Sequence, residues 1–357
     1  MSELKQIVDL WRLSKARGEE VCLATVVRTE GSSYRKPGAR MLLTRSGQRA
    51  GTISGGCLEG EVTKKAWWLT ENGPTIQRYS SFFDEDSPMP YGLGCGGVVY
   101  VLLERGAAVH AILDALQANL EERRAFVIIT DIHVAKTLLV RSADGSTPFA
   151  SHSGLENFIE RAMREHCSFF APGEHELFVE YVEPLTALAI FGAGDDAKPL
   201  SEFARKLGWH VTVADGRSSL VRPERFPAAD KILALDYGSS AFLDGLDLDS
   251  EHAYVLMTHS YEQDRALLRK LLPLAPRYLG ILGPSQRTLR LISEIANDVH
   301  LRQEECLALL HSPVGFDIGA HSPEGIALSI VAEIFAVLNG REGLSLKKRA
   351  HLLPIHA

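Results

Sequence analysis

Two cysteines framed by glycines are the residues best suited to chemistry in this sequence. Residues 51–61 read GTISGGCLEGE, with Cys57 directly after Gly55 and Gly56, and residues 91–97 read YGLGCGG around Cys95. The apolar residues after Cys57 have helical spacing, so we expect its thiol in the first turn of a helix. Unsatisfied N–H groups and the positive end of the helix dipole lower the pKa of a thiol there.

A thiolate is both a nucleophile and a ligand for soft metals, so this position predicts a reactive or metal-binding Cys57. The alternative is that both cysteines are small apolar residues packed in tight turns, as most free cysteines are. The other cysteines, Cys22, Cys167 and Cys306, lie in apolar or helical segments, and we interpret them as structural.

A basic segment precedes these glycines in the sequence. Residues 31–41 read GSSYRKPGARM and carry Arg35, Lys36 and Arg40. Guanidinium groups offer planar bidentate donors, and glycines let an anionic ligand approach the backbone closely. The segment therefore predicts a binding site for a phosphate or for the polar edge of a pterin.

A second glycine motif lies at residues 187–197, which read ALAIFGAGDDA. An apolar strand runs into Gly192 and Gly194, with Ala197 at the third small position, as in the G-x-G-x-x-G/A fingerprint of dinucleotide-binding loops. The next predicted strand ends in Asp215, where an acidic residue commonly binds ribose hydroxyls. The pattern predicts a nucleotide site, with NAD(P) or another nucleotide as its ligand.

Two carboxylates oppose this interpretation of the loop. Asp195 and Asp196 stand at the start of the predicted helix, where they can satisfy its dipole and repel an anion. The alternative is a Rossmann-like domain whose glycine loop only begins a helix, because a fold does not fix a function.

Other candidate residues follow later strands of the same region. His259 and Asp264 come after the strand AYVLMT, and Arg287 comes after YLGIL in the turn GPSQR. Ligands of open α/β sheets bind beyond the carboxyl ends of the strands, which makes His259 a candidate acid or base and Arg287 a candidate anion ligand. Asp264 is expected to cap the following helix or to orient the His259 ring.

The elements that must position these residues divide the chain into two domains. We predict an N-terminal mixed α/β domain over residues 1–183 and a C-terminal Rossmann-like, doubly wound parallel sheet over residues 184–357. Strand-like and helical segments alternate in the second region, and its strands are apolar, as in parallel sheets that are covered by helices on both faces. The acidic, Pro- and Gly-containing stretch 171–183 marks the boundary.

Composition excludes several classes of protein. Charged residues make up 23% of the chain and its net charge is −7, which gives no electrostatic basis for binding nucleic acid. No apolar run approaches the roughly 18–20 residues that span a bilayer, and the N-terminus lacks the pattern of a secretory signal. We therefore expect a cytoplasmic protein without a membrane segment. Five widely spaced cysteines without a CxxC pair argue against a disulfide framework.

Together, these motifs resemble the XdhC/CoxF family of accessory proteins that handle molybdenum cofactor for xanthine dehydrogenase-type hydroxylases. The resemblance extends over nearly the whole chain and rests on the order of its segments. These are GSSYRKPGARM, GTISGGCLEGEV and LGCGG in the first region, and IFGAGDDA, VTVADGR, MTHSYEQD, LGILGPSQR and VGFDIGAHSPEGIALSIVAEI in the second.

The resemblance implies a chaperone that binds molybdenum cofactor (molybdopterin) and delivers it, in sulfurated form, to an apo-hydroxylase. It implies that Cys57 holds the cofactor or its molybdenum, that Arg35, Lys36 and Arg40 bind its phosphate or pterin, and that the protein forms a homodimer. A cysteine desulfurase is a further expected partner. Two other functions stay open at this point: an NAD(P)-dependent oxidoreductase, for which His259 supplies the acid or base, and an adaptor that binds no small molecule.

Overall fold

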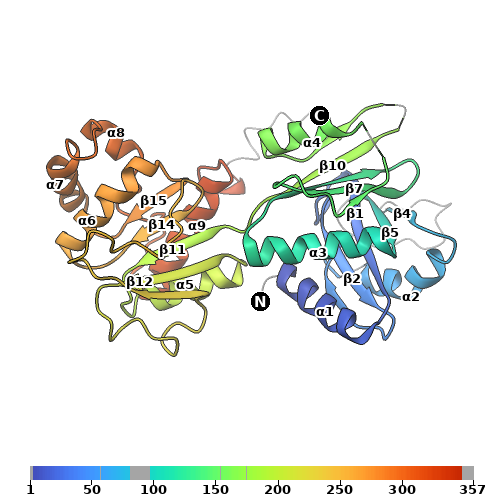
Figure 1. Ribbon diagram of the computed structural model, residues 1–357, viewed down its shortest axis with the longest axis horizontal. Coiled ribbons are helices and arrows are strands. Elements are labelled where there is room, and N and C mark those ends of the chain that lie inside the picture. Colours follow the sequence, from blue (N-terminus) through green and yellow to red (C-terminus); the bar gives the residue numbers. More distant parts are fainter. Residues whose placement is uncertain (1–2, 57, 81–96, 153, 174, 348–357) are drawn as a thin grey trace. The chain divides into compact units, whose positions relative to one another are not determined.

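The computed structural model describes residues 3–56, 58–80, 97–152, 154–173 and 175–347. The chain forms two compact units, Met1–Leu185 and Thr186–Ala357, which we call unit 1 and unit 2 and describe separately (Figure 1).

Unit 1 contains two five-stranded antiparallel sheets. The first sheet has the order β3-β2-β1-β5-β4 and the second the order β8-β7-β6-β10-β9. The strands of the first are β1 (Val21–Gly31), β2 (Arg40–Thr44), β3 (Arg49–Gly51), β4 (Thr75–Ser80) and β5 (Gly97–Glu104). Those of the second are β6 (Phe126–Asp131), β7 (Lys136–Ser142), β8 (Phe149–Ala150), β9 (Phe169–Ala171) and β10 (Leu177–Val182).

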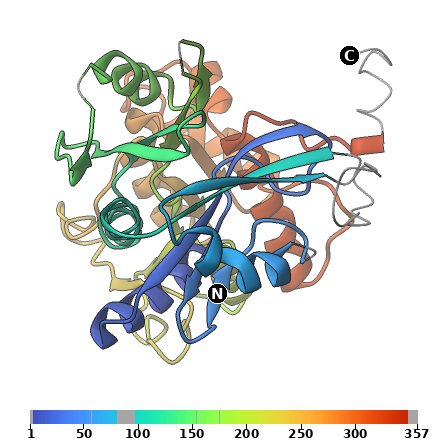
Figure 2. The ribbon, with the colours of Figure 1, turned by 90° about the vertical axis from the view of Figure 1, so that its right-hand side faces the viewer.

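The helices of unit 1 alternate with its sheets in five layers, which can be followed in Figure 2. Alternate residues of a strand face opposite sides of its sheet, so each sheet contributes to two cores. Val21 and Leu23 pack on helices between the two sheets, whereas Cys22 and Ala24 pack on a helix outside the first sheet. The inner helices are α1 (Glu3–Arg17) and α3 (Ala107–Glu122), and the outer ones are α2 (Glu59–Leu69) and α4 (Glu156–Glu165).

Unit 2 is a parallel five-stranded sheet with the order β13-β12-β11-β14-β15. In chain order this is 3-2-1-4-5, the arrangement of Rossmann folds, and the strand order reverses between β11 and β14. The strands are β11 (Ala187–Phe191), β12 (His210–Asp215), β13 (Lys231–Ala234), β14 (Ala253–Leu256) and β15 (Tyr278–Ile281).

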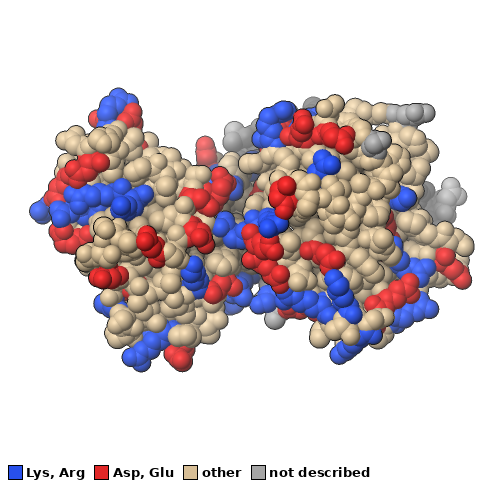
Figure 3. Space-filling view, in the orientation of Figure 1, with Lys and Arg blue, Asp and Glu red and all other residues tan. Residues whose placement is uncertain are grey.

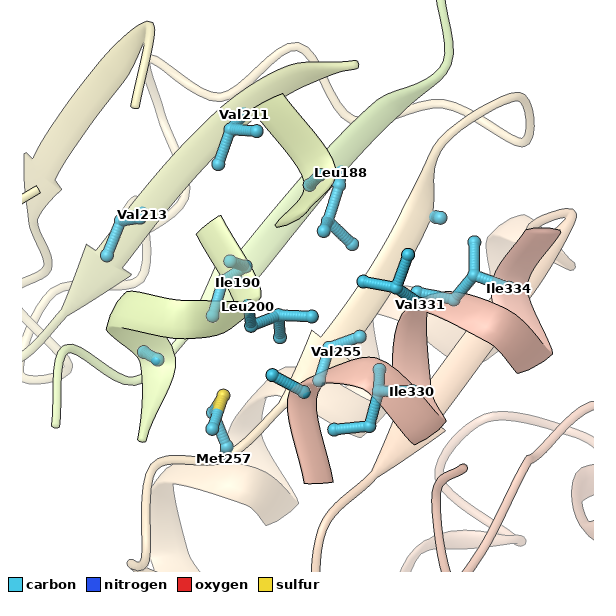
Figure 4. Close-up of a cluster of buried hydrophobic side chains, with 14 of the residues drawn as sticks. Leu188, Ile190, Leu200, Val211, Val213, Val255, Met257, Ile330, Val331 and Ile334 are labelled. Carbon is cyan, nitrogen blue, oxygen red and sulfur yellow. The ribbon is translucent and has the colours of Figure 1, made fainter. Parts of the chain in front are cut away.

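Helices cover both faces of this sheet. Two of them, α5 (Ala197–Lys206) and α9 (Pro323–Leu338), pack on one face, and Figure 4 shows Leu200 beside the strand residue Ile190 and Ile330 beside Val255 in the same buried cluster. The other face packs on α6 (Tyr261–Leu271), α7 (Ser285–Ile295) and α8 (Gln303–Ala308), and a short 3-10 helix, η1 (Leu272–Leu274), follows α6. The predicted fold class, a mixed α/β first region and a doubly wound parallel second region, is confirmed.

The predicted alternation of apolar strands with helices is found in unit 2. In unit 1 the prediction missed β3, β4, β7, β8, β9 and α4. The missed strands of these sheets are short or carry polar residues, as in the sequence TIQRYS of β4, so their apolar signal is weak.

Candidate functional site

Three glycine-rich segments of unit 1 meet at one end of the first sheet. The ring of Tyr34 lies 3.7 Å from the position that a Cβ of Gly55 would occupy. A Cβ on Gly97, the first residue of β5, would lie 2.1 Å from the carbonyl oxygen of Ser32, so only glycine allows this approach. The fold thus brings the basic segment, the GTISGG loop and the end of the YGLGCGG segment together.

Hydrogen bonds fix the loop that leads into α2. The buried carboxylate of Glu59 accepts hydrogen bonds from the N–H groups of Ile53 (3.1 Å) and Ser54 (2.8 Å) and from the Ser54 hydroxyl (2.6 Å). The Ser54 Oγ in turn accepts hydrogen bonds from the N–H groups of Gly56 (3.2 Å) and Leu58 (3.1 Å). Glu59 and Ser54 were not predicted from the sequence; a Ser and a Glu close together at a helix start were the available signal.

This network changes the expected electrostatics at the start of α2. The helix begins at Glu59, so its first turn starts later than predicted, and the N–H of Leu58 is already bonded. Burial by itself raises the pKa of Glu59, but the hydrogen bonds from Ser54 and the backbone outweigh it and hold this pKa below its usual value. Glu59 and Glu61 therefore place carboxylates in the first turn, where they offset the positive end of the dipole.

Cys57 and Cys95 lie outside the described residues, and the structure gives no account of their thiols. Gly55 and Gly56, which precede Cys57, are exposed, and Gly56 has a φ of 112°, a conformation that favours glycine. Among the other cysteines, Cys167 is exposed, Cys306 is buried, and burial raises the pKa of Cys22 to about 12. On the N-terminal side of Cys57 the backbone of two glycines is thus exposed, whereas Leu58 on its C-terminal side is buried.

The three basic residues of the segment have different environments. Arg40 is buried and forms a bidentate ion pair with Glu180, in which one N–O distance is 2.8 Å. Arg35 is half-buried and pairs with Glu3, whose other oxygen accepts hydrogen bonds from Thr52. Lys36 is exposed, and its side chain makes no hydrogen bond or ion pair with the described part of the chain.

Arg40 was predicted to bind a phosphate or a pterin, but its guanidinium is committed to Glu180, a residue far away in the sequence. Removing either partner would leave a buried charge without compensation. We therefore assign Arg40 a structural role, and only Lys36 and Arg35 of the three stay available to an anion.

In unit 2 the glycine loop closes tightly on the neighbouring strand. Gly192 has a φ of 128°, and a Cβ there would lie 2.3 Å from the carbonyl oxygen of Met257, so glycine is required. The N–H of Ala193 donates to Asp215 Oδ2 at 2.7 Å. Asp215 is fully buried and also accepts hydrogen bonds from the backbone and guanidinium of Arg217. Asp215 thus holds the loop and is not presented to a ribose, contrary to its predicted role.

The two acidic residues of this loop point in different directions. Asp195 is exposed and pairs with Lys198 (2.7 Å) and Arg225 (3.1 Å). The carboxylate of Asp196 lies against Gly194, and its Oδ2 lies 2.9 Å from His259 Nε2, within hydrogen-bond distance. Neither carboxylate caps α5, because Asp196 stands at the N-cap position without a side-chain cap hydrogen bond.

Asp264 and Arg287 form a separate pair close to His259. Asp264 is buried and accepts a hydrogen bond from Thr258 Oγ1 (2.6 Å), and its Oδ2 lies 2.7 Å from Arg287. Burial raises the pKa of Asp264 even though both partners lower it. Asp264 was predicted to cap α6 or to orient the His259 ring, and it does neither. Ser260 caps α6 by accepting a hydrogen bond from Gln263 N, and Asp196 is the carboxylate next to the His259 ring.

No group of three or more metal-ligating side chains occurs in the described ranges, and no helix within them is long and apolar enough to cross a membrane. On the face drawn in Figure 3, the described Lys and Arg side chains are interspersed with Asp and Glu.

Comparison with known proteins identifies the family. Residues 14–80 match the XdhC and CoxI family, and residues 188–334 match the XdhC Rossmann domain. A Bacillus subtilis protein, named as a probable subunit of xanthine dehydrogenase, is 31% identical over 329 residues, which cover 88% of this chain and 92% of the relative. This chain belongs to the XdhC and CoxI family.

Two further relatives extend the XdhC comparison. The molybdenum cofactor insertion chaperone PaoD of Escherichia coli is 24% identical over 323 residues, covering 90% of this chain and 84% of PaoD. A crystal structure described as a xanthine dehydrogenase from Bacillus halodurans has a TM-score of 0.76 and 30% identity, and the match covers 94% of this chain and 97% of that one. The predicted family is confirmed, and the XdhC Rossmann domain lies within unit 2.

Proposed function

We propose that this XdhC-family protein is an accessory chaperone that binds molybdenum cofactor and delivers it, in sulfurated form, to a xanthine dehydrogenase-type hydroxylase. The cofactor is cargo in this proposal, and no substrate is turned over. Support comes from the relationship to PaoD, which is named as a chaperone for insertion of this cofactor.

The observation that carries the proposal is the meeting of the glycine-rich segments in unit 1. The exposed Gly55 lies beside the ring of Tyr34, the exposed Gly56 follows it in the chain, and Gly97 lies against Ser32. Glycines without side chains and an exposed aromatic ring are suited to a flat, anionic ligand, because the backbone can be approached and the ring can stack. The segments that meet are those that contain or adjoin Cys57 and Cys95.

Each residue of this surface has a proposed role. Cys57 supplies a thiolate ligand to molybdenum, a choice that fits soft sulfur chemistry, and Cys95 is a second candidate thiol. Lys36, exposed and unpaired within the described residues, binds the phosphate of the molybdopterin. Arg35 joins it by exchanging Glu3 for the ligand.

The proposal includes partners that follow from the family. We propose a hydroxylase as the recipient, a cysteine desulfurase as the source of sulfur, a homodimeric chaperone and a cytoplasmic location. Delivery requires that the ligand be released, which a few exposed contacts permit better than an enclosed cavity.

The test is cofactor retention by variants with one thiol removed. The protein is co-expressed with the molybdenum cofactor pathway, and the pterin that copurifies is oxidised and measured by fluorescence. Wild type and Cys167→Ala, which removes an exposed thiol elsewhere in unit 1, should retain equal amounts. Cys57→Ala should lose at least about tenfold, as expected for loss of a metal–thiolate bond. Equal retention by Cys57→Ala, or no pterin on wild type, would refute the role of Cys57.

A further inference from the structure

The crevice where a Rossmann fold binds its ligand is bridged by protein side chains in unit 2. Ligands of such sheets bind where the strand order reverses, between the loops that follow β11 and β14 here. Asp196 belongs to the first loop and His259 to the second, and their side chains meet at 2.9 Å. We call the space over Gly194 beside this pair the anion seat.

The carboxylate of Asp196 occupies the anion seat. Its Oδ1 lies 2.5 Å from the position that a Cβ of Gly194 would occupy. In dinucleotide-binding loops this second glycine has no side chain so that the pyrophosphate can approach the backbone. Here the group that makes this approach is the protein's own anion, and its second oxygen is held by His259.

The backbone conformation of His259 indicates that its contact with Asp196 is fixed by the fold. Its φ is 60°, in the left-handed region that residues other than glycine rarely adopt. The histidine is the first residue after Thr258, whose hydroxyl is bonded to the buried Asp264. The turn is therefore fixed by a buried contact, and it directs the imidazole at Asp196.

Asp215, the residue at the position that binds the ribose in dinucleotide-binding folds, is also fully hydrogen-bonded within the protein. Asp215 accepts hydrogen bonds from Ala193 N and from the backbone N, Nε and Nη2 of Arg217, two on each carboxylate oxygen, at 2.7–3.0 Å. A carboxylate offers about four acceptor sites, so no site is left for a ligand hydroxyl.

We infer that Asp196, held by His259, fills the anion seat of the glycine loop, so that unit 2 does not bind the phosphates of a nucleotide there. The residues present do not fit an NAD(P) cofactor, and the oxidoreductase alternative has no cofactor site in this crevice. The inference concerns unit 2 alone and is independent of the role proposed for unit 1.

The experiment measures binding of NADH, ADP and inorganic pyrophosphate to the full-length protein by calorimetry. Wild type should show no saturable binding at millimolar concentration. Asp196→Ala should bind pyrophosphate or ADP at least about tenfold more tightly than wild type, because it empties the seat and removes a like charge from the site of the anion. The nearly isosteric Asp196→Asn removes the charge but leaves a side chain in the seat, so its gain should be smaller. Asp195→Ala is the matched control, because it removes the same charge from the same loop but leaves the seat occupied.

Three results would overturn the inference. Saturable binding of NADH or ADP by wild type that Arg217 and Gly194 variants abolish would show a working nucleotide site. Equal gains in affinity in Asp195→Ala and Asp196→Ala would mean that the change in net charge, and not the emptied seat, causes the tighter binding. Absence of any gain in both folded Asp196 variants, with folding checked by circular dichroism, would show that Asp196 does not close the seat.

Discussion

At the scale of single residues, Asp215 shows how a charged side chain can serve structure where sequence suggested binding. Its pKa is lowered, because hydrogen bonds from Arg217 and Ala193 outweigh the burial that alone raises it. A carboxyl group whose pKa is lowered by folding stabilises the folded state at pH values above its ordinary pKa of about 3.9. This contribution is lost as the pH falls through the folded-state pKa. We predict that Asp215→Asn reduces the free energy of unfolding by about 1.5–3 kcal/mol at pH 7 and by less at about pH 3.

Urea unfolding followed by circular dichroism at the two pH values checks this prediction. Asp244→Asn is the control, since this exposed carboxylate makes no side-chain hydrogen bond or ion pair within the described residues, and it should change stability by no more than about 0.5 kcal/mol. A loss in Asp215→Asn that is equal at the acidic and the neutral pH would contradict a charge-dependent role.

At the scale of elements, the loop before α2 is fixed by one carboxylate. The Glu59 carboxylate accepts hydrogen bonds from Ile53 and Ser54, and Ser54 Oγ accepts hydrogen bonds from the N–H groups of Gly56 and Leu58. We predict that Glu59→Gln raises the amide exchange rates of these residues about tenfold or more, because hydrogen bonds to a charged acceptor contribute about 1.5–3 kcal/mol. Hydrogen exchange read out by mass spectrometry measures this directly.

The control for the loop is Glu61→Gln, in the same first helical turn. Glu61 pairs with Lys65 across one turn at 2.6 Å and makes no hydrogen bond to the loop in the part of the chain that the structure describes. Loss of the Glu61 charge should leave the amide hydrogen-exchange rates over residues 53–58 unchanged. Similar exchange in both variants would mean that helix charge, and not the Glu59 bonds, orders the loop.

At the scale of the whole molecule, each unit has its own cores. Unit 1 buries apolar side chains in the layers between and outside its two sheets, and unit 2 does so on both faces of one sheet. We predict that residues 1–185 and 186–357, expressed separately, each unfold cooperatively in calorimetry. The first fragment should retain molybdenum cofactor as the full chain does, since the proposed ligands all belong to it. A 1–185 fragment that is folded but retains no cofactor would contradict this assignment.

Much of the fold could be predicted because apolar periodicity is local. The strands and helices of unit 2 alternate as predicted, since each strand is a short apolar run. Local signals also mark the start of α9, where Ser322 accepts a hydrogen bond from Gly325 N. The antiparallel strands of unit 1 were harder to predict, because their pairing depends on partners distant in the chain and several carry polar residues.

The sequence by itself determined the family, the α/β class and the glycine-rich segments suited to a ligand, because these depend on residue types and on spacing along the chain. Tertiary structure alone decided which charges stay free for that ligand. Arg40 meets Glu180, Asp215 meets Arg217 and the glycine loop, and Asp196 meets His259, whereas Lys36 meets no partner within the described residues. The contacts of Arg40, of Asp196 and of Asp215 with Ala193 join residues far apart in the chain. No local pattern encodes them, because a charged side chain is paired by whatever the fold places within a few ångströms of it.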